Sequence, residues 1–432
     1  MQKTNPEDLY NKFRQHPYIS TDSRIAQPGS LFFSLKGDNF NGNIYSRQAL
    51  DNGAAYAVID DPAYYSGSQT LLVDDVLLSL QRLASDYRSN IRIPVIGITG
   101  TNGKTTTKEL MATALSSRFI THATTGNFNN HIGVPITLLN IKPETEIAVI
   151  EMGANHPGEI AALCEIARPT HGLITNIGKA HLEGFGSLEG VISAKNELFN
   201  YLRKNGGRVF VNAGNALLMS LTADMERITY GDTAEASFRG KISGQGAMLE
   251  VLLESPVRLQ IQTRLAGNYN FENLMAALCI AHHFRVELTD AALAIENYEP
   301  RMNRSQLLKT SRNTVIMDAY NANPSSMRAA ITNFAAMDAP VKILILGDMF
   351  ELGNDAPAEH AQIIQLALQL KFDTVLAAGP QFAAASAGLT GVQAFAGAPE
   401  LKTWLNEVKF SDAHILVKGS RGMKLETITE CL

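Results

Sequence analysis

The stretch Pro94-Val95-Ile96-Gly97-Ile98-Thr99-Gly100-Thr101-Asn102-Gly103-Lys104-Thr105-Thr106-Thr107 decides the fold of the middle of this chain. Its apolar run ends at a glycine-containing turn, and Lys-Thr-Thr-Thr-Lys-Glu-Leu-Met then begins an amphipathic pattern, which predicts a strand, a loop and a helix. Backbone N–H groups at a helix start point toward a bound anion, and the helix dipole favours negative charge there. The stretch therefore predicts a nucleotide-phosphate site, with Lys104 at the outer phosphates and Thr105 on Mg²⁺.

The loop departs from the strict phosphate-loop spacing at one position, because Ile98 stands where that pattern has a glycine. The core Gly100-x-x-Gly103-Lys104-Thr105 is retained. An ordinary glycine-rich turn between a strand and a helix is the alternative, and the Lys-Thr pair with its flanking elements favours phosphate binding. The loop alone does not indicate which reaction is catalysed.

Length and composition restrict the class of protein. A chain of 432 residues needs more than one hydrophobic core, and 45% hydrophobic with 18% charged residues is typical of soluble globular proteins. The net charge of −5 argues against a broad nucleic-acid surface. The polar N-terminus indicates no signal peptide, and no window approaches the ~18 apolar residues of a membrane span. Three scattered cysteines indicate neither disulfides nor a zinc site, so we expect a cytoplasmic enzyme.

Apolar runs and helical patterns divide the chain into three α/β blocks, residues 1–85, 86–300 and 301–432. In the first block, the pattern predicts short buried strands at 31–35 and 55–59, with a helix at 44–52 between them. In the second block, apolar runs alternate with helical patterns, which predicts a parallel sheet with helices on its faces. Its predicted strands are 93–98, 146–152, 172–177 and 208–212.

Residues 226–265 have a different pattern, with alternating polarity and many glycines, which predicts antiparallel strands appended to the sheet. Residues 270–284 predict a helix. The third block returns to alternating runs and helices, which predicts a second open α/β sheet of Rossmann type. Its predicted strands are 314–318, 341–347, 373–379 and 413–418.

Polar side chains follow the predicted strands of the second block, at the edge where α/β sheets gather ligands. Glu151 is well placed to hold Mg²⁺ beside the phosphates, although strand-end carboxylates also cap helices. His181 is open to three interpretations: a metal ligand, a base or, more commonly, a loop histidine. Asn127, Asn129 and Asn130 lie in a polar loop suited to a sugar or peptide ligand, or to a plain turn.

Together these motifs resemble the Mur ligases, the ATP-dependent amide-forming enzymes of peptidoglycan precursor synthesis. Residues 99–106 are similar to their phosphate loop, which also accounts for Ile98. Further segments resemble the member that adds D-alanyl-D-alanine to UDP-N-acetylmuramoyl-tripeptide, and the matches run from residue 22 to residue 422. These segments are 127–135 (NFNNHIGVP), 151–160 (EMGANHPGEI), 181–186 (HLEGFG), 318–324 (DAYNANP) and 346–353 (LGDMFELG). The Asp-Asn-Pro-Arg motif typical of the ligase that adds the third residue is not found in the sequence.

The resemblance implies catalytic and cofactor roles for single residues. Lys104 and Thr105 would hold the γ-phosphate and Mg²⁺, with Glu151 and His181 at a second metal position. Lys195 matches a lysine that many members carry as a carbamate, a modification that turns a neutral amine into an oxygen ligand. A solvated helix lysine is the alternative for Lys195. The remaining ATP-binding residues implied are Gly100, Thr101, Asn102, Gly103, Thr106, Asn273 (adenine), Arg304 (phosphates) and Asp318 (ribose).

For Asn273, Arg304 and Asp318 the alternatives are a helix amide, a surface arginine and a strand-end cap. The resemblance also implies substrate contacts. Ser23 and Arg24 match the uridine-diphosphate pocket, although Asn41-Gly42-Asn43 stands where the family often has Asp-Gly-His. The other substrate candidates are Asn127, Asn129, Asn130, Asn321 and Asn323, with Asp348, Glu351, His360, Lys418 and Ser420 on the dipeptide side.

The implied protein is a monomer with small-molecule substrates, ATP and two Mg²⁺ ions, and without nucleic-acid partners or a membrane span. The three blocks would bind the UDP-sugar, ATP and the dipeptide, respectively. Phosphoryl transfer to the tripeptide carboxylate gives an acyl phosphate, and the dipeptide amine attacks it through a tetrahedral intermediate. The alternatives are a sister ligase with another acceptor, including a folate type, and a nucleotide switch without ligase activity. The Asn-Lys-x-Asp motif usual in guanine-nucleotide switches is not found in the sequence.

Overall fold

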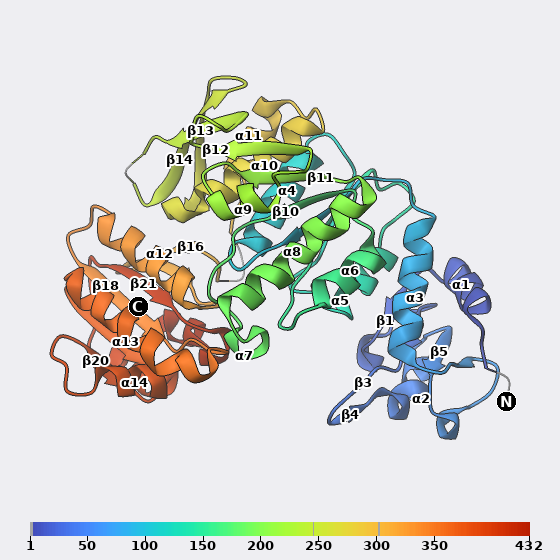
Figure 1. Ribbon diagram of the computed structural model, residues 1–432. Coiled ribbons are helices and arrows are strands. Elements are labelled where there is room, and N and C mark those ends of the chain that lie inside the picture. Colours follow the sequence, from blue (N-terminus) through green and yellow to red (C-terminus); the bar gives the residue numbers. More distant parts are fainter. Residues whose placement is uncertain (1–2, 245, 301–302) are drawn as a thin grey trace.

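A computed structural model describes residues 3–244, 246–300 and 303–432. In Figure 1 the chain runs from an N-terminal part (blue) through a central part (cyan to yellow) to a C-terminal part (orange to red). The central part lies between the other two, so the first and last parts of the chain are at opposite ends of the molecule. Three separate sheets form the frames of these parts.

The first sheet is parallel throughout and lies in the N-terminal part (Figure 1). In spatial order its strands are β1 (Ile19–Ser20), β2 (Leu31–Phe33), β5 (Tyr56–Ile59) and β6 (Thr70–Leu72), and the small pair β3 (Lys36–Gly37) and β4 (Phe40–Asn41) lies apart. Strands β2 and β5 confirm the two predicted strands. Helices α1 (Pro6–Gln15) and α3 (Val76–Ser89) pack against each other.

The helix predicted over 44–52 is shorter than expected. A 3₁₀ turn, Gly42–Tyr45, comes first, and α2 covers only Ser46–Asp51. The cause is local, because the Asn41 side chain accepts a hydrogen bond from Asn43 N at 3.0 Å and so starts a tight turn.

The second sheet holds nine strands within the described residues. In spatial order they are β15 (Leu259–Ala266), β14 (Met248–Ser255), β13 (Phe238–Ile242), β12 (Arg227–Gly231), β11 (Arg208–Asn212), β10 (His171–Ile174), β7 (Val95–Thr99), β9 (Ile147–Glu151) and β8 (Thr121–Ala123). All pairs from β13 to β8 are parallel, and only β13–β14 and β14–β15 are antiparallel. The parallel sheet predicted for this block is confirmed.

The antiparallel arrangement predicted for 226–265 is wrong for its first half, because β12 is parallel to both of its neighbours, β11 and β13. The pairing of β12 with β13 is short and staggered, with Tyr230 opposite Phe238 and Gly231 opposite Arg239. Strand β13 therefore begins beside the end of β12 and continues in the same direction, without the return that a hairpin requires.

Helices cover both faces of the second sheet, and its strands supply two hydrophobic cores. On β7, Val95 packs into one core, while Ile96 and Ile98 pack into the other. The first core includes α3, α5 (Gly133–Leu139), α6 (Glu159–Ala167) and α8 (Leu188–Asn205), and the second includes α4 (Lys104–Ser116), α10 (Phe271–His283) and α11 (Leu288–Glu296). The short helices α7 (Leu182–Phe185) and α9 (Ala216–Leu221) follow β10 and β11 along the chain. Helix α10 confirms the helix predicted over 270–284.

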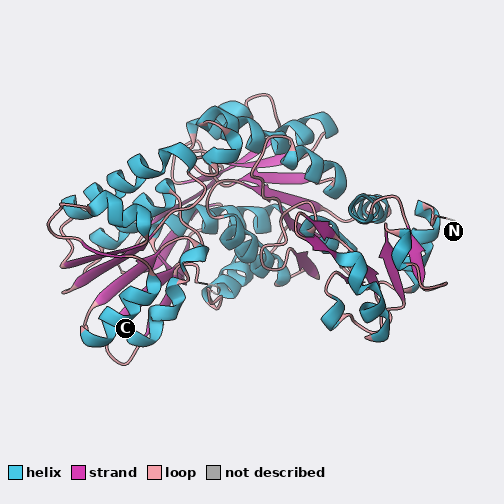
Figure 2. Ribbon diagram, turned by 90° about the horizontal axis from the view of Figure 1, so that it is seen from below, coloured by secondary structure: helices cyan, strands magenta, loops and turns pink. Residues whose placement is uncertain are grey.

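The third sheet forms the C-terminal part, and Figure 2 shows its strands between layers of helices. In spatial order the strands are β16 (Gln306–Lys309), β17 (Thr314–Asp318), β21 (His414–Lys418), β18 (Lys342–Gly347), β19 (Thr374–Ala378) and β20 (Gln393–Phe395). One core includes α12 (Pro324–Ala336), α13 (Ala356–Gln369) and α14 (Pro380–Ser386), and the other includes α15 (Ala398–Glu407). Strands β17, β18, β19 and β21 confirm the predicted open α/β sheet.

Strands β16 and β20 were not predicted from the sequence. Both are short edge strands whose residues are largely half-buried or exposed, so they lack the apolar run that marks the central strands. Strand β16 is also antiparallel to β17, unlike the rest of its sheet.

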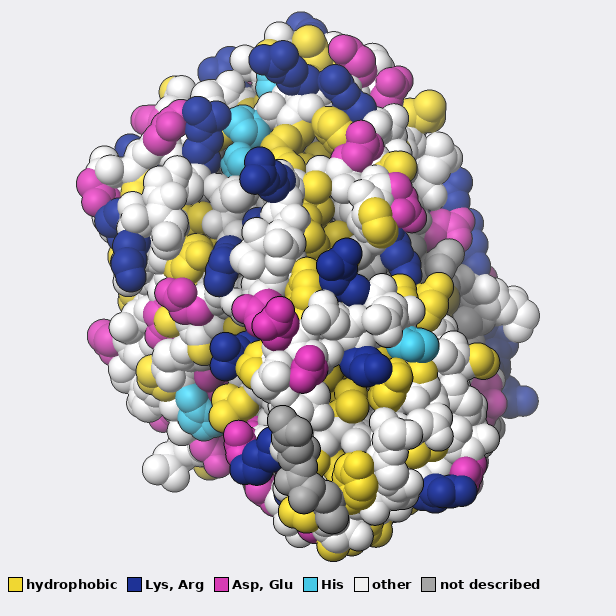
Figure 3. Space-filling view, turned by 90° about the vertical axis from the view of Figure 1, so that its right-hand side faces the viewer, with side chains coloured by type: hydrophobic (Ala, Val, Ile, Leu, Met, Phe, Trp, Pro, Cys, Tyr) yellow, Lys and Arg dark blue, Asp and Glu magenta, His cyan; other side chains and the backbone are white. Residues whose placement is uncertain are grey.

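The surface is chemically mixed where Figure 3 shows it. Basic and acidic side chains alternate over that face, with hydrophobic side chains between them. Within the part of the chain that the structure describes, each helix is too short or too polar to cross a membrane.

Candidate active site

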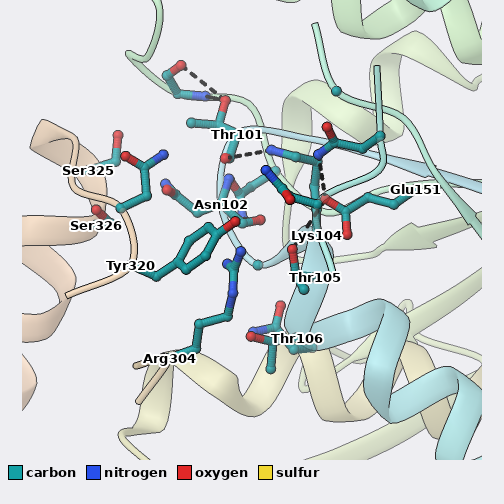
Figure 4. A pocket seen from close by; sticks show the side chains of 18 of the residues that line it. Thr101, Asn102, Lys104, Thr105, Thr106, Glu151, Arg304, Tyr320, Ser325 and Ser326 are labelled. Carbon is teal, nitrogen blue, oxygen red and sulfur yellow. Dashed lines mark hydrogen bonds between the residues drawn. The ribbon is translucent and has the colours of Figure 1, made fainter. Parts of the chain in front are cut away.

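A cavity of about 900 Å³ lies between the central and C-terminal parts of the molecule. Its walls come from the loop after β7, the ends of β9 and β10, the start of α10 and the segment 318–326. Figure 4 shows the side chains of this cavity, with Tyr320 and Arg304 facing the loop that carries Asn102 and Lys104. The sequence-predicted residues that line it are Thr101, Asn102, Gly103, Lys104, Thr105, Thr106, Asn127, Asn129, Asn130, Glu151, His181, Asn273, Arg304, Asp318, Asn321 and Lys418.

The loop between β7 and α4 has the predicted strand–loop–helix geometry and depends on its two glycines. Gly100 has φ +143° and Gly103 has φ +80°, which are conformations that L side chains rarely adopt. A Cβ atom at Gly103 would lie 2.4 Å from Asn273 Oδ1, and one at Gly100 would lie 2.0 Å from Thr175 Oγ1. The sheet and α10 therefore press closely on the loop and hold its backbone around the start of α4.

Lys104 begins α4, and its ammonium group folds back over the loop. Its Nζ donates to Gly100 O at 2.7 Å and to Thr101 O at 3.1 Å. Burial lowers the pKa of Lys104, and the positive charge of Arg304 lowers it further, against the opposing effect of Glu151. A polyanion at the loop would reverse this shift, because it would restore a partner for the charged amine.

Thr105 and Glu151 form an oxygen-rich pair beside this lysine. Thr105 Oγ1 donates to Glu151 Oε1 at 3.2 Å, and Glu151 is only 1% exposed. Its second oxygen, Oε2, is buried without a hydrogen-bond partner among the described residues. A buried carboxylate oxygen that lacks a donor, next to a hydroxyl, suits a hard cation such as Mg²⁺. Within the described ranges, no group of three His, Cys, Asp or Glu side chains is gathered as a ready metal cage.

In the asparagine-rich loop, the side chains of Asn129 and Asn130 each make hydrogen bonds within the protein. Asn129 Nδ2 donates to Glu151 Oε1 at 2.8 Å, so this amide orients the carboxylate. Asn130 Oδ1 accepts from Gly133 N at 2.9 Å and from Ile132 N at 3.1 Å, at the start of α5. Both residues and Asn127 still line the cavity.

Arg304 and Asp318 reach the cavity from the C-terminal side. The Arg304 guanidinium lies 3.6 Å from the centre of the Tyr320 ring, and its Nε is buried without a hydrogen-bond partner among the described residues. Asp318 accepts from Lys418 Nζ at 2.6 Å and from Ser305 N at 3.1 Å. Lys418 is therefore an ion-pair partner of Asp318 in this structure.

Asn273 is held behind the phosphate loop. Its Oδ1 accepts from Thr107 Oγ1 at 3.0 Å, and its Nδ2 donates to Asn270 Oδ1 at 2.9 Å. The side chain therefore links α10 to α4 while it lines the cavity.

Direct contacts tie the C-terminal part to the central part across the cavity. Asn323 Nδ2 donates to Asn102 Oδ1 at 2.7 Å. Lys179 Nζ lies 2.8 Å from Glu359 Oε1, and His181 pairs with Glu351. In this arrangement His181 faces a carboxylate of the C-terminal part.

Lys195, on α8, is buried with 2% of its surface exposed. Its Nζ lies 3.4 Å from Ala154 O and 5.3 Å from the centre of the Phe185 ring. Burial, together with the charge of Lys104, lowers the pKa of Lys195 to about 7. The solvated helix lysine that the sequence left open as an alternative is excluded.

Ser23 and Arg24 lie in the N-terminal part, apart from the residues that line the cavity. Ser23 Oγ donates to Gln48 Oε1 at 2.8 Å, and Arg24 Nη2 pairs with Asp22 Oδ2 at 2.6 Å. Arg24 is largely exposed.

Three residues assigned to the dipeptide side from the sequence make hydrogen bonds within the C-terminal part. Asp348 accepts from Phe382 N at 2.9 Å and so caps α14, and Met349 N donates to His360 Nε2 at 2.9 Å. Ser420 Oγ accepts from Phe350 N at 3.0 Å. Asp348 and His360 are buried with at most 1% of their surface exposed, so they cannot present their side chains to a ligand in this state.

The motifs did not indicate several residues that line the cavity. Tyr320 lies inside the 318–324 segment, where an aromatic side chain by itself does not distinguish a cavity wall from a core. Ser325 and Ser326 follow it at the start of α12, and Asn268 and Tyr269 belong to a 3₁₀ turn before α10. A polar helix start beside a motif was the signal for the two serines.

Comparison with known proteins gives a consistent family match along the chain. Residues 17–97 match the model "Mur ligase family, catalytic domain", residues 98–281 match "Mur ligase middle domain", and residues 303–421 match "Mur ligase, glutamate ligase domain".

Curated relatives and solved structures agree with these matches. The UDP-N-acetylmuramoyl-tripeptide–D-alanyl-D-alanine ligases of Bacillus subtilis and Escherichia coli are each 34% identical, over 96% of this chain and 92% and 93% of theirs. A crystal structure of MurF from Acinetobacter baumannii has a TM-score of 0.86 at 31% identity, covering 96% of this chain and 92% of that one. The MurF ligase of Thermotoga maritima in complex with ADP shares the fold, with a TM-score of 0.83 at 24% identity and 96% coverage of both chains.

Proposed function

Because this chain belongs to the Mur ligase family, we propose that it is the ATP-dependent ligase that joins D-alanyl-D-alanine to UDP-N-acetylmuramoyl-tripeptide. The product is UDP-N-acetylmuramoyl-pentapeptide for peptidoglycan synthesis. The observation that carries the proposal is the match at 34% identity over 96% of the chain to relatives of that name. The phosphate loop supports it, because the loop opens into a cavity shared by two parts of the molecule.

We assign one substrate to each part of the chain. Residues 1–85 bind the UDP-sugar, with Ser23 and Arg24 near the uridine diphosphate. Residues 86–300 bind ATP, with Gly100 to Thr106 around the phosphates and Asn273 toward the adenine. Residues 301–432 bind the dipeptide and bring Arg304 and Asp318 to the nucleotide. We also propose that the protein works as a monomer.

The reaction has two steps, phosphoryl transfer and attack by the amine. The tripeptide carboxylate attacks the γ-phosphorus of ATP, the bond to the ADP oxygen breaks, and an acyl phosphate forms. The dipeptide amine then attacks the acyl carbon, loses a proton, and expels phosphate from the tetrahedral intermediate. Negative charge spreads over the transferring group in both steps, and the cations of Lys104 and Arg304 stabilise it.

Thr105 and Glu151 would hold one Mg²⁺, which neutralises phosphate charge when bound. Asn129 would keep the Glu151 carboxylate oriented through the hydrogen bond described above. For a second ion we propose Glu151, His181 and a carbamate on Lys195. A lysine with a pKa of about 7 is partly neutral at pH 7, and the neutral amine captures CO₂ to give an oxygen donor with loss of a proton. In the asparagine-rich loop, Asn127 and Asn130 would contact UDP-N-acetylmuramoyl-tripeptide. Asn321 and Asn323 would contact substrate from the C-terminal part.

We predict that the C-terminal part rotates when nucleotide and substrate bind. Around the cavity the two parts are joined by Asn102–Asn323, Lys179–Glu359 and His181–Glu351, and exposed ion pairs are individually weak. Two further polar contacts between the parts involve the 3₁₀ turn before α10, where Asn268 N donates to Asn333 Oδ1 at 2.9 Å and Tyr269 pairs with Ser305 at 2.7 Å. Closure would exclude water and protect the acyl phosphate from hydrolysis. Small-angle scattering should show a smaller radius of gyration with a non-hydrolysable ATP analogue and UDP-N-acetylmuramoyl-tripeptide than without them. Closely similar profiles in the two states would contradict the rotation.

The decisive test measures ADP release by the purified protein with UDP-N-acetylmuramoyl-tripeptide. Parallel reactions contain D-alanyl-D-alanine, single amino acids or no acceptor. Release that needs both the tripeptide and the dipeptide is the expected result. Release with a single amino acid, or with a folate substrate, would replace the proposal by a sister ligase. Release without any acceptor would favour a nucleotide switch.

A further inference from the structure

Lys108 is a buried charge that the proposed reaction does not use. It lies one helical turn after Lys104 on α4, and only 2% of its surface is exposed. Burying an ammonium group is costly unless the protein supplies partners for it. A lysine in this position therefore needs a structural or functional reason.

Lys108 Nζ lies 4.0 Å from Glu109 Oε1 on its own helix, and its other partners come from two other segments. Its Nζ donates to Thr124 O at 2.6 Å and to Gly126 O at 3.4 Å, in the polar loop that runs from β8 to α5. The same Nζ lies 4.0 Å from Glu151 Oε2, at the end of β9. The ammonium group thus lies where α4, the asparagine-rich loop and the buried carboxylate of Glu151 meet.

Other hydrogen bonds hold the two ends of this loop, and its middle has two backbone hydrogen bonds of its own, Phe128 N to Thr125 O at 3.2 Å and Asn129 N to Asn127 O at 2.7 Å. Thr124 is fixed to the sheet, because its N donates to Val149 O at 3.0 Å and its Oγ1 accepts from Glu151 N at 2.9 Å. At the far end, Gly153 N donates to Asn129 O at 2.7 Å. Between these ends the chain turns through Gly126 at φ +57°, and Lys108 ties this turn to α4.

We propose that Lys108 is a positioning residue for the nucleotide-sugar peptide substrate. By holding the carbonyls of Thr124 and Gly126 it sets the path of residues 124–130, which places Asn127 and Asn129 on the cavity wall. The proposal rests on the proposed function, because it takes that substrate to be the ligand of this loop. It also explains why a charged side chain is present here, since an apolar one would deprive the carbonyls of buried Thr124 and half-buried Gly126 of this donor.

The test compares Lys108→Met, which keeps the length and removes the charge and donors, with Lys108→Arg, which keeps both. Lys204→Met is the matched control, because Lys204 is exposed in the last turn of α8. Calorimetry measures the dissociation constants of ADP and of UDP-N-acetylmuramoyl-tripeptide. For Lys108→Met we expect the constant for the UDP-tripeptide to rise at least about tenfold, as for the loss of a buried charge-assisted hydrogen bond. The constant for ADP should change less than about threefold, and Lys108→Arg should lie closer to wild type.

Hydrogen exchange supplies a second readout that needs no substrate. Amides of residues 125–131 should exchange faster in Lys108→Met, while those of β7 and β9 stay protected. Equal losses of ADP and UDP-tripeptide affinity, or unchanged affinities with unchanged exchange, would overturn the positioning role. If wild-type protein does not bind the UDP-tripeptide, the proposed function fails, and the exchange result still decides whether Lys108 holds the loop. If Lys108→Met does not fold, Lys108→Gln serves in the same comparison.

Discussion

Replacing Lys104 by alanine is expected to lower turnover by about a thousandfold or more, with the fold intact. Lys104 stands at the start of α4, where its positive charge can stabilise the phosphoryl group during transfer. Its loss removes a stabilising interaction that is strongest when negative charge spreads in the transition state. The measurement is the rate of ADP release with both substrates saturating, alongside circular dichroism and thermal unfolding.

The fold should survive because other hydrogen bonds hold the phosphate loop in place. Thr101 N donates to Asn176 O at 2.8 Å, and Asn102 N donates to Asn176 Oδ1 at 3.0 Å. Lys104 now binds the carbonyls of Gly100 and Thr101. Thr101 lines the cavity, where water can replace the amine. Lys204→Ala serves as the control for loss of one positive charge. Near-normal turnover in Lys104→Ala would contradict the assignment of residues 100–106 as the phosphate loop.

The features that the sequence predicted best are those that depend only on residues close together in the chain. The strand, loop and helix around 94–107 follow from an apolar run, two glycines and a helix start, and all of these are visible within one short window. The central strands of both large sheets were found for the same reason, since strands buried on both faces are continuous apolar runs. Edge strands such as β16 and β20 were missed because their burial depends on neighbours that the pattern does not contain.

The parts of the site that could not be predicted depend on contacts between distant segments. Asn102 and Asn323 are 221 residues apart in the chain, and their hydrogen bond exists only because two sheets meet at the cavity. Asp348 and His360 look like ligand groups in the sequence, yet the third sheet and its helices surround them and use them as hydrogen-bond partners. Lys108 is the opposite case, because a lysine on a helix is usually solvated and only the packing shows it buried.

Replacing Lys195 by alanine is expected to lower turnover by roughly a hundredfold, in line with losing a group that helps to bind a catalytic metal. Small carboxylates such as acetate or formate should restore part of the rate, because they can supply the oxygen donor that a carbamate would provide. Lys195→Arg is the matched variant, since a guanidinium keeps the charge and cannot form the carbamate. It should be as slow as Lys195→Ala and should not respond to added carboxylate. Unchanged turnover in both variants would leave Lys195 as a buried packing residue only.

The lowered pKa gives Lys195 a second signature that is independent of activity. In the folded protein its pKa is about 7, against an ordinary value of 10.5, so between these values the unfolded chain binds the extra proton and the native chain does not. Stability therefore rises with pH across this window, and below about pH 7 the buried charge imposes its full cost. In CO₂-free buffer, the free energy of unfolding of the wild type relative to Lys195→Ala should increase as the pH is raised from about 7 toward 10. A flat difference would mean that the Lys195 amine keeps its ordinary pKa, and the argument for its capture of CO₂ near neutral pH would then fail.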